Sequence, residues 1–411
     1  MELSIIIPIH NSEKYLKECM ESALSQDFCD MEILCVDSST DSSFSIIEEM
    51  RKRDGRIQYI YDSNPSYGHK INIGVEKARG TYIMILESDD RLCSGAARSL
   101  YDIAEKFGAD MADGDYLEFF TYKNREYQIV VKKYPNPSLY DRWIHSADFE
   151  EKPLVSSGIW TALYRKTFLQ KHQIRLNESK GAAYQDLSFL FLTGLLSESV
   201  YHISRPVYEY RIDNAGSSMK DNRKVFEIAG ECDFLKGELL KRRIEDKRVW
   251  SLYDMRKYEA YRWNYCRLSL KSREVFLEKY LKELREDIGK KVGKLFAEAA
   301  LEQDKQIPIQ TIGNFLETLK EQELVVFGAG AVGGAAISVL LENKKKPAAI
   351  CDNSEVLQGT DRGGIWITSV EETVKRFPKA LYLIMSREYG GEMKKQLLRA
   401  GIKEEAVFIF T

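Results

Sequence analysis

The sequence predicts an α/β protein with a doubly wound sheet in its N-terminal half, followed by a helical region and a second, smaller α/β domain. Two observations predict this order. From the N-terminus onward, short apolar runs alternate with amphipathic stretches, which is the pattern of strand–helix–strand units. A further strand, a glycine-rich turn and the start of a helix occur together at 323–333.

The composition is that of a globular protein with no general affinity for nucleic acid. The chain has 411 residues, enough for two or three domains, with 44% hydrophobic and 30% charged residues. Its 60 Lys and Arg nearly balance 63 Asp and Glu, so no nucleic-acid partner is expected. Seven scattered cysteines indicate free thiols in a reducing compartment. We expect a cytoplasmic protein, since no signal peptide or bilayer-spanning run is evident.

Four strands are predicted in the N-terminal region, at 3–9, 32–36, 57–61 and 82–86. The first is expected to end with Pro8 and the polar residues after it. The last is apolar throughout, as in a strand buried on both faces. Amphipathic spacing predicts helices after Ser12, after the polar run 37–43 and at 70–77.

Polar side chains follow the first two strands. After the first, the His10 ring can lie against a nucleobase and Asn11 can offer amide hydrogen bonds. After the second, Asp37 can accept a hydrogen bond from a base N–H, or it can cap the following helix. The carboxyl ends of parallel strands meet at one crevice, so we expect these side chains to lie close together.

Three acids, Glu87, Asp89 and Asp90, follow the 82–86 strand. Carboxylates so close together cannot all stay ionised without a cation to offset their repulsion. Hard oxygen ligands with alternate spacing suit Mg²⁺ or Mn²⁺, which could then hold the phosphates of a substrate. The alternative is a solvated acidic turn that caps the next helix.

Segments in this region resemble, in order, the motifs of family 2 glycosyltransferases, which are inverting enzymes with the GT-A fold. The segments are 4–16, 35–42, 72–80 and 86–90, and the resemblance extends over residues 3–220. It implies a mixed, doubly wound GT-A sheet, a divalent metal and a nucleotide-diphospho-sugar donor, with UDP as the expected carrier.

The resemblance assigns roles to the residues at the strand ends. It implies that the nucleotide pocket is lined by Pro8, His10, Asn11 and Asp37. Lys70 and Asn72 are expected near the ribose and diphosphate. In the 86–90 motif, Glu87 and Asp89 occupy the metal-linked positions with Ser88 between them, and Glu87 replaces the usual aspartate. Ile71 stands where the family has arginine, so Lys70 is expected to supply that cation.

Two further positions follow from the resemblance. Asp186, at the predicted start of an apolar helix, stands where the family has its general base, although an acid there also favours the helix dipole. Arg211, near the end of the resembling region, is suited to a diphosphate. The stretch 157–169 resembles the segment that borders the acceptor site.

The remaining N-terminal segments are less specific. We expect an edge strand or two at 111–122 and a loop over the site at 132–148, whose aromatic residues either stack on a sugar or hold the loop in place. The region 225–319 is predicted to be helical. Its basic and aromatic residues either contact anionic lipid headgroups or pack between helices.

The C-terminal domain carries the G-x-G-x-x-G pattern at Gly328, Gly330 and Gly333, and Asp352 ends the next predicted strand. This arrangement is typical of half a Rossmann fold, in which the turn binds phosphate and the acid accepts from a ribose hydroxyl. The glycines could equally serve only the packing of helix on strand. We therefore expect domains at 1–222, 223–320 and 321–411.

The sequence thus predicts an inverting, metal-assisted glycosyltransferase that acts on a glycan, lipid-linked or protein acceptor in surface polysaccharide or glycoconjugate biosynthesis. Peripheral contact with the inner face of a membrane is compatible with it. Two alternatives remain: a nucleotide-sugar-binding scaffold without turnover, and an NAD-dependent oxidoreductase that uses the C-terminal glycine turn.

Overall fold

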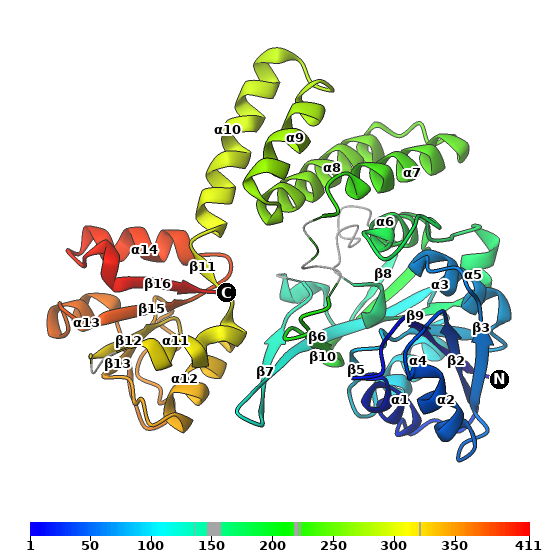
Figure 1. The fold of residues 1–411 in the computed structure, drawn as a ribbon, viewed down its shortest axis with the longest axis horizontal. Coiled ribbons are helices and arrows are strands. Elements are labelled where there is room, and N and C mark those ends of the chain that lie inside the picture. The colour runs from blue at the N-terminus through cyan, green and yellow to red at the C-terminus, as the bar shows by residue number, and fades with distance from the viewer. Residues whose placement is uncertain (135, 146–157, 218–220, 222, 320–321) are drawn as a thin grey trace. The chain divides into compact units, whose positions relative to one another are not determined.

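The computed structural model describes residues 1–134, 136–145, 158–217, 221, 223–319 and 322–411 (Figure 1). The chain divides into two compact units. Unit 1 comprises residues 1–117 and 131–278, and unit 2 comprises residues 118–130 and 279–411. No helix in the described part of the chain is long and apolar enough to cross a membrane.

A mixed ten-stranded sheet underlies unit 1, in the order β3-β2-β1-β4-β9-β6-β10-β5, with β7 beside β6 and β8 beside β10. The first four strands are parallel, and β9 and β10 pair antiparallel with their neighbours β4 and β5. The strands are β1 (Leu3–Ile9), β2 (Met31–Asp37), β3 (Ile57–Tyr61), β4 (Tyr82–Ile85), β5 (Arg91–Leu92), β6 (Met111–Tyr122), β7 (Arg125–Val131), β8 (Trp143–His145), β9 (Ala162–Arg165) and β10 (Ser199–Arg211). The predicted doubly wound, mixed α/β sheet is confirmed.

Helices cover both faces of the parallel strands. Ile5 and Ile7 point into a core shared with α1 (Leu16–Leu24), α2 (Ser43–Arg51) and α4 (Ala96–Phe107). Ile6 points to the other face, where α3 (Tyr67–Lys77) approaches so closely that a Cβ on Gly74 would lie 2.5 Å from the Ile6 side chain. A strand buried on both faces needs apolar residues in succession, which Ile5, Ile6 and Ile7 supply.

The strands differ from the sequence-based predictions in three places. Pro8 lies inside β1, in register with Val36, so the polar residues after Ile9 end the strand instead. The prediction of an edge strand at 111–122 is wrong, because β6 lies between β9 and β10 in the sheet. Of the predicted loop at 132–148, the described part includes β8, while Pro135 and 146–148 lie outside the described residues.

The predicted helical region is divided between the two units. Its helices are α7 (Glu227–Lys241), α8 (Lys247–Arg267), α9 (Leu270–Leu281), α10 (Glu286–Gln303) and α11 (Ile312–Thr318). The first two belong to unit 1, since Asn264 and Arg267 on α8 donate hydrogen bonds to the backbone oxygens of Val225 and Lys224. Tyr253, Tyr261 and Tyr265 of α8 are buried. Their burial favours the alternative in which the aromatic residues of this region pack between helices.

Unit 2 is built on a six-stranded parallel sheet in the order β11-β16-β15-β12-β13-β14. The strands are β11 (Gln306–Ile307), β12 (Leu324–Phe327), β13 (Ala349–Cys351), β14 (Ile367–Thr368), β15 (Leu381–Met385) and β16 (Val407–Phe410). Helices α13 (Val370–Arg376) and α14 (Gly390–Arg399) cover one face, and α11 and α12 (Ala331–Glu342) lie over the other (Figure 1). The strand order on the two sides of β12 is that of a doubly wound Rossmann-type sheet. With six strands, this sheet is larger than the half Rossmann fold that the sequence predicted.

Residues 118–130 form the tip of the β6–β7 hairpin and pack within unit 2. The Arg387 guanidinium donates to the carboxylate of Glu118, with Nη1 to Oε1 at 2.6 Å. The Tyr122 hydroxyl donates to Glu317 at 3.0 Å, and the Tyr127 hydroxyl donates to Glu342. The boundaries of the two units therefore differ from the predicted domain boundaries. The reason is that residues 118–130 pack with residues 279–411, which lie far away in the sequence.

Candidate active site

The polar ends of β1, β2 and β4 lie at one edge of the sheet of unit 1. Ile9 is in register with Asp37, and the Ser38 N–H donates to the Ile9 carbonyl at 3.2 Å. On the other side of β1, the Leu86 N–H donates to the Ile6 carbonyl at 2.9 Å. The residues that follow these strands are thus brought together, as the sequence predicted.

The segment after β1 is held to the segment after β2 by side-chain hydrogen bonds. His10 Nδ1 lies 3.0 Å from Ser38 Oγ, and Asn11 Oδ1 accepts from the Thr40 N–H at 2.8 Å. Asn11 has a φ of 54°, a left-handed conformation that asparagine tolerates better than most residues. These bonds join the two segments that form one wall of the predicted nucleotide pocket.

Asp37 is buried at the end of β2. Its Oδ1 accepts from the Ser39 N–H at 2.8 Å, and its Oδ2 accepts from the Tyr59 hydroxyl at 3.3 Å. The N-cap of α2 is Ser42. The alternative in which Asp37 caps that helix is therefore wrong, and Asp37 instead shapes the turn that follows β2.

Lys70 places a buried cation among the carboxylates of three strand ends. Its side chain lies on α3, and its Nζ donates to the Pro65 carbonyl at 3.2 Å. Burial lowers the pKa of Lys70 to about 8, while the charges of Asp37, Asp62 and Glu87 act in the opposite direction. This position suits the role expected of Lys70 as the cation that replaces the family's arginine.

Asn72, the other residue expected near the donor, uses its amide group within the protein. Its Nδ2 donates to the Leu176 carbonyl and to Glu178 Oε1, both at 2.9 Å, and its Oδ1 accepts from the Leu176 N–H at 3.0 Å. These bonds attach α3 to the segment that leads to Asp186. They favour a supporting role for Asn72 rather than direct contact with a ligand.

Glu87 receives a hydrogen bond from the hydroxyl of Tyr67 on α3. Burial raises the pKa of Glu87 to about 8; the Tyr67 hydrogen bond opposes this, and the charges of Asp89 and Asp186 add to it. Tyr67 also joins Glu87 to the segment that leads to Asp186, since the Tyr67 N–H donates to the Gly181 carbonyl at 2.9 Å. The predicted metal ligand and the predicted base thus come together across almost a hundred residues of sequence.

The other residues of the 86–90 motif have different partners. Asp89 accepts from Asn214 Nδ2 at 2.7 Å, and Ser88 Oγ lies 2.6 Å from Ser12 Oγ. Asp90 is buried and accepts from the Tyr208 hydroxyl at 2.9 Å and from the Arg211 N–H at 2.8 Å. Burial raises the pKa of Asp90 well above its usual value. The third acid is therefore part of the scaffold.

Arg211, expected to bind a diphosphate, is engaged within the protein. Its Nη2 contacts Glu18 Oε2 at 2.5 Å, its Nε donates to the Asp89 carbonyl at 3.0 Å, and its guanidinium lies 4.5 Å from the Tyr15 ring centroid. These contacts brace the turn that presents Glu87 and Asp89. They favour positioning of the acidic motif over direct binding of phosphate.

Asp186 lies in the first turn of α6 (Gln185–Leu196), after Tyr184 in a left-handed conformation with φ of 65°. Burial raises the pKa of Asp186, while the positive charge of Arg256 and the backbone N–H groups of the helix start hold it down. The Asp186 carboxylate thus accepts hydrogen bonds from the helix start, as expected for an acid at that position. Its role as the general base stays a prediction.

Sequence reasoning missed Tyr67, Tyr208 and Arg256. Tyr208 donates to Asp90 and accepts from the Glu87 N–H at 3.0 Å, so it holds the acidic turn from β10. Arg256 comes from α8, outside the motifs, and no local pattern marks it. The position of Tyr67 just before the predicted 70–77 helix is the only signal that could have drawn attention to it.

A divalent cation fits the two predicted ligands. Glu87 and Asp89 are close enough for Asp89 to raise the pKa of Glu87, so a cation between them would relieve their repulsion. No group of three or more His, Cys, Asp or Glu side chains suited to a metal occurs in the described parts of the chain. Mg²⁺ commonly needs only one or two protein carboxylates, because water and substrate phosphates complete its shell.

The glycine turn of unit 2 is shaped mainly by packing. A Cβ on Gly333 would lie 1.9 Å from the Gly328 carbonyl oxygen, and Gly328 has a φ of 104°. A Cβ on Gly330 would meet nothing within 4 Å, so packing does not require that glycine. Asp352 accepts from the Ala329 N–H at 2.6 Å and the Ser354 N–H at 2.8 Å. Its carboxylate therefore already serves the turn.

Comparison with known proteins identifies the domain. Residues 4–165 match the model of the family described as glycosyl transferase family 2. The chain carries a family 2 glycosyltransferase domain. The match covers the strand ends described above, from β1 to the end of β9, and it leaves Asp186 and unit 2's C-terminal sheet outside.

Curated relatives of this glycosyltransferase domain occur in Streptococcus pneumoniae. The chain is 28% identical over 218 residues to the glycosyltransferase GlyA, which is 51% of this chain and 30% of GlyA. It is 27% identical over 253 residues to the glycosyltransferase GlyG, which is 59% of this chain and 80% of GlyG. The chain thus spans less than a third of the length of GlyA.

A solved structure shows the same fold. The crystal structure of S. aureus TarS 1-349 in complex with UDP-GlcNAc matches with a TM-score of 0.55 at 18% identity, covering 74% of this chain and 88% of that chain. At this identity the likeness concerns the fold of the glycosyltransferase.

Proposed function

We propose that this chain transfers a sugar from a nucleotide-diphospho-sugar, with UDP as the carrier, to an acceptor hydroxyl with inversion at the anomeric carbon. The acceptor is a glycan, lipid-linked or protein-linked chain in surface polysaccharide or glycoconjugate biosynthesis. The observation that carries the proposal is the link from Glu87 through Tyr67 to the segment before Asp186: the Tyr67 hydroxyl donates to Glu87, and the Tyr67 N–H donates to the Gly181 carbonyl at 2.9 Å. This link brings the expected base toward the acids expected to hold the donor diphosphate.

In this mechanism Asp186 takes the proton from the acceptor hydroxyl as that oxygen attacks the anomeric carbon. The Arg256 charge keeps the buried Asp186 carboxyl available as a base. The Lys70 ammonium, among Asp37, Asp62 and Glu87, stabilises the departing diphosphate. A Mg²⁺ or Mn²⁺ ion held by Glu87 and Asp89 would supply further neutralisation of the leaving group.

In this proposal the nucleotide binds against the two hydrogen-bonded segments that follow β1 and β2. The exposed His10 ring offers a surface for a base, and Asp37 and Asn11 hold the two segments in the required shape. The TarS structure that shares this fold was solved with UDP-GlcNAc, which supports the choice of a UDP-sugar for the first assays.

The test is UDP release from a panel of UDP-sugars in the presence of Mn²⁺, with the wild-type chain and with Asp186→Asn. The variant keeps the shape of the side chain but cannot accept the proton, so donor affinity is retained while kcat falls by at least ~10²-fold. Wild-type binding of the donor without any turnover would support the scaffold alternative, and normal turnover by Asp186→Asn would place the base elsewhere.

The oxidoreductase alternative has less support. The Asp352 oxygens that would accept from a ribose hydroxyl already accept from Ala329 and Ser354. Fluorescence of added NADH provides the direct test, and a saturable change that depends on Gly330 would favour that alternative.

A further inference from the structure

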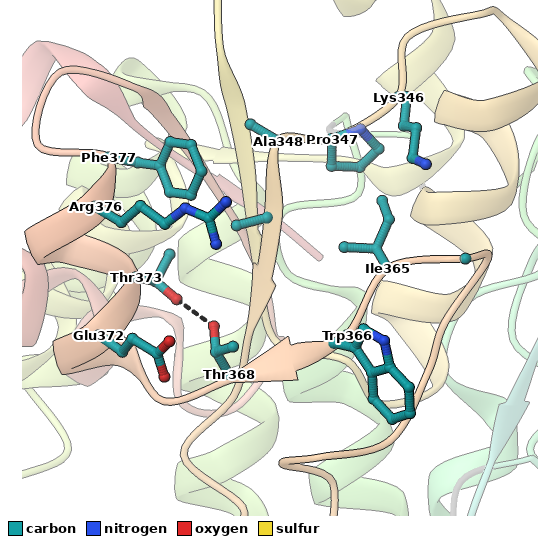
Figure 2. A pocket seen from close by; sticks show the side chains of 12 residues that line it. Lys346, Pro347, Ala348, Ile365, Trp366, Thr368, Glu372, Thr373, Arg376 and Phe377 are labelled. Atoms are coloured by element: carbon teal, nitrogen blue, oxygen red, sulfur yellow. Dashed lines mark hydrogen bonds between the residues drawn. The ribbon is translucent and has the colours of Figure 1, made fainter.

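A cavity of about 280 Å³ lies in unit 2, away from the glycine turn (Figure 2). It is bordered by 346–349 at the start of β13, by 364–368 leading into β14, and by the end of α13. In the sheet, Val325 is in register with Ala349, whereas Phe327, which precedes the glycine turn, is in register with Cys351. The cavity therefore lies at the opposite end of β13 from that turn.

The cavity exists because β13 and β14 pair over a very short length. Their register comprises only Ile350 with Ile367 and Cys351 with Thr368, so the segments before these residues, which border the cavity, are not paired with each other as strands. A hydrogen bond of 2.7 Å between the hydroxyls of Thr368 and Thr373 ties β14 to α13 below the opening. The strand β14 and the helix α13 thus form a hydrogen-bonded border of the cavity.

Two cations, Lys346 and Arg376, and one carboxylate, that of Glu372, line this space. Figure 2 shows the Arg376 guanidinium directed into the cavity beside Phe377, with Lys346 on the far side. Arg376 lies 5.2 Å from the Phe377 ring centroid, and neither cation makes an ion pair or a side-chain hydrogen bond within the described residues. An unpaired guanidinium held against an aromatic ring is suited to bidentate binding of a carboxylate or phosphate.

An aromatic side chain completes the site. Trp366 is 66% exposed at the mouth of the cavity, on the side opposite Arg376 (Figure 2). An exposed indole offers a flat apolar face that a sugar ring can cover while its hydroxyls remain in water. The volume lies just below the usual range for ligand pockets, so it suits one sugar unit rather than a dinucleotide.

We propose that this cavity binds one anion-bearing sugar unit, with the phosphate or carboxylate on Arg376 and Lys346 and the ring against Trp366. The proposal does not rest on the transfer reaction of unit 1. The same chemistry could come from a free sugar phosphate or from an acidic unit within a polysaccharide.

The test is calorimetric titration of the full chain with glucose 1-phosphate and with glucuronate, compared with glucose and with inorganic phosphate. Saturable binding of the acidic sugars, at least ~10-fold tighter than that of glucose or phosphate alone, is expected from one additional charge-assisted hydrogen bond. A glucuronate-containing oligosaccharide that binds more tightly than its monosaccharide would indicate the polymer as the source, and equal affinity would indicate the free sugar.

Variants assign the binding to this cavity. Arg376→Gln and Trp366→Ala should each weaken it by about 10-fold, and Arg399→Gln, an exposed cation on α14 outside the cavity, should leave it unchanged. Circular dichroism checks that each variant is folded. The proposal is overturned if no acidic sugar binds saturably, if phosphate alone binds as tightly, or if Arg376→Gln binds as the wild type does.

Discussion

The Tyr67 hydroxyl donates a hydrogen bond to the Glu87 carboxylate, and this bond joins the first turn of α3 to the turn that follows β4. Tyr67 also lies near Asp186, whose charge contributes to raising the pKa of the Tyr67 hydroxyl above its usual value after the larger effect of burial. The bond therefore orients one acid of the proposed metal site at a point close to the proposed base.

Tyr67→Phe should weaken Mn²⁺ binding by 10- to 100-fold, roughly the range for loss of a hydrogen bond to a metal ligand. The phenyl ring keeps the packing, so the melting temperature should change little. Electron paramagnetic resonance of free Mn²⁺ measures the affinity directly. Tyr389→Phe, on an exposed tyrosine of unit 2, is the matched control. Unchanged Mn²⁺ affinity in Tyr67→Phe would show that this bond does not serve a metal site.

Asp89→Ala should abolish both turnover and Mn²⁺-dependent UDP binding, since Asp89 is the expected principal ligand. Glu87→Asp should be tolerated, because a shorter carboxylate can reach the ion through water. Turnover and calorimetry with UDP, each with and without chelator, measure the two effects. Full activity of Asp89→Ala, or of the wild type in excess chelator, would refute the metal assignment.

Arg256→Gln should shift the acidic limb of the kcat/KM profile to higher pH. In the wild type the Arg256 charge lowers the pKa of Asp186, so its loss raises that pKa and leaves less of the base ionised at low pH. Activity should therefore fall more below neutral pH than above it. Arg262→Gln, on an exposed arginine of the same helix, should leave the profile in place. If the pH profile of Arg256→Gln matches that of the wild type, the Arg256 charge does not affect the pKa of the catalytic base.

A chain truncated after Leu319 should still transfer sugar, because the proposed catalytic residues all lie in unit 1. It should nevertheless be less stable, since Glu118 is buried and loses its Arg387 partner, and Tyr127 loses Glu342. Glu118→Gln in the truncated chain removes the uncompensated charge and should recover part of the melting temperature. If the truncated chain folds and binds donor but transfers nothing, unit 2 belongs to the active site.

Much of the fold was predictable because its signals are local. The β1, β2 and β4 strands are mainly apolar runs buried on both faces, and the order of motifs along 4–90 predicted the sheet and the acids at its edge. The position of β6 was not predictable. Its neighbours β9 and β10 come from 162–211, and pairing with them depends on contacts that no local pattern encodes.

The candidate site divides in the same way. By itself the sequence determined which residue types stand at the strand ends, and so placed His10, Asp37 and Glu87 at one crevice. Only the tertiary structure decided that Asp90 is buried under Tyr208 and that Arg211 is held by Glu18. It also decided that Arg256 of α8 lies near Asp186. Burial and charge depend on neighbours brought together by folding, and the spacing of residues along one segment carries no information about them.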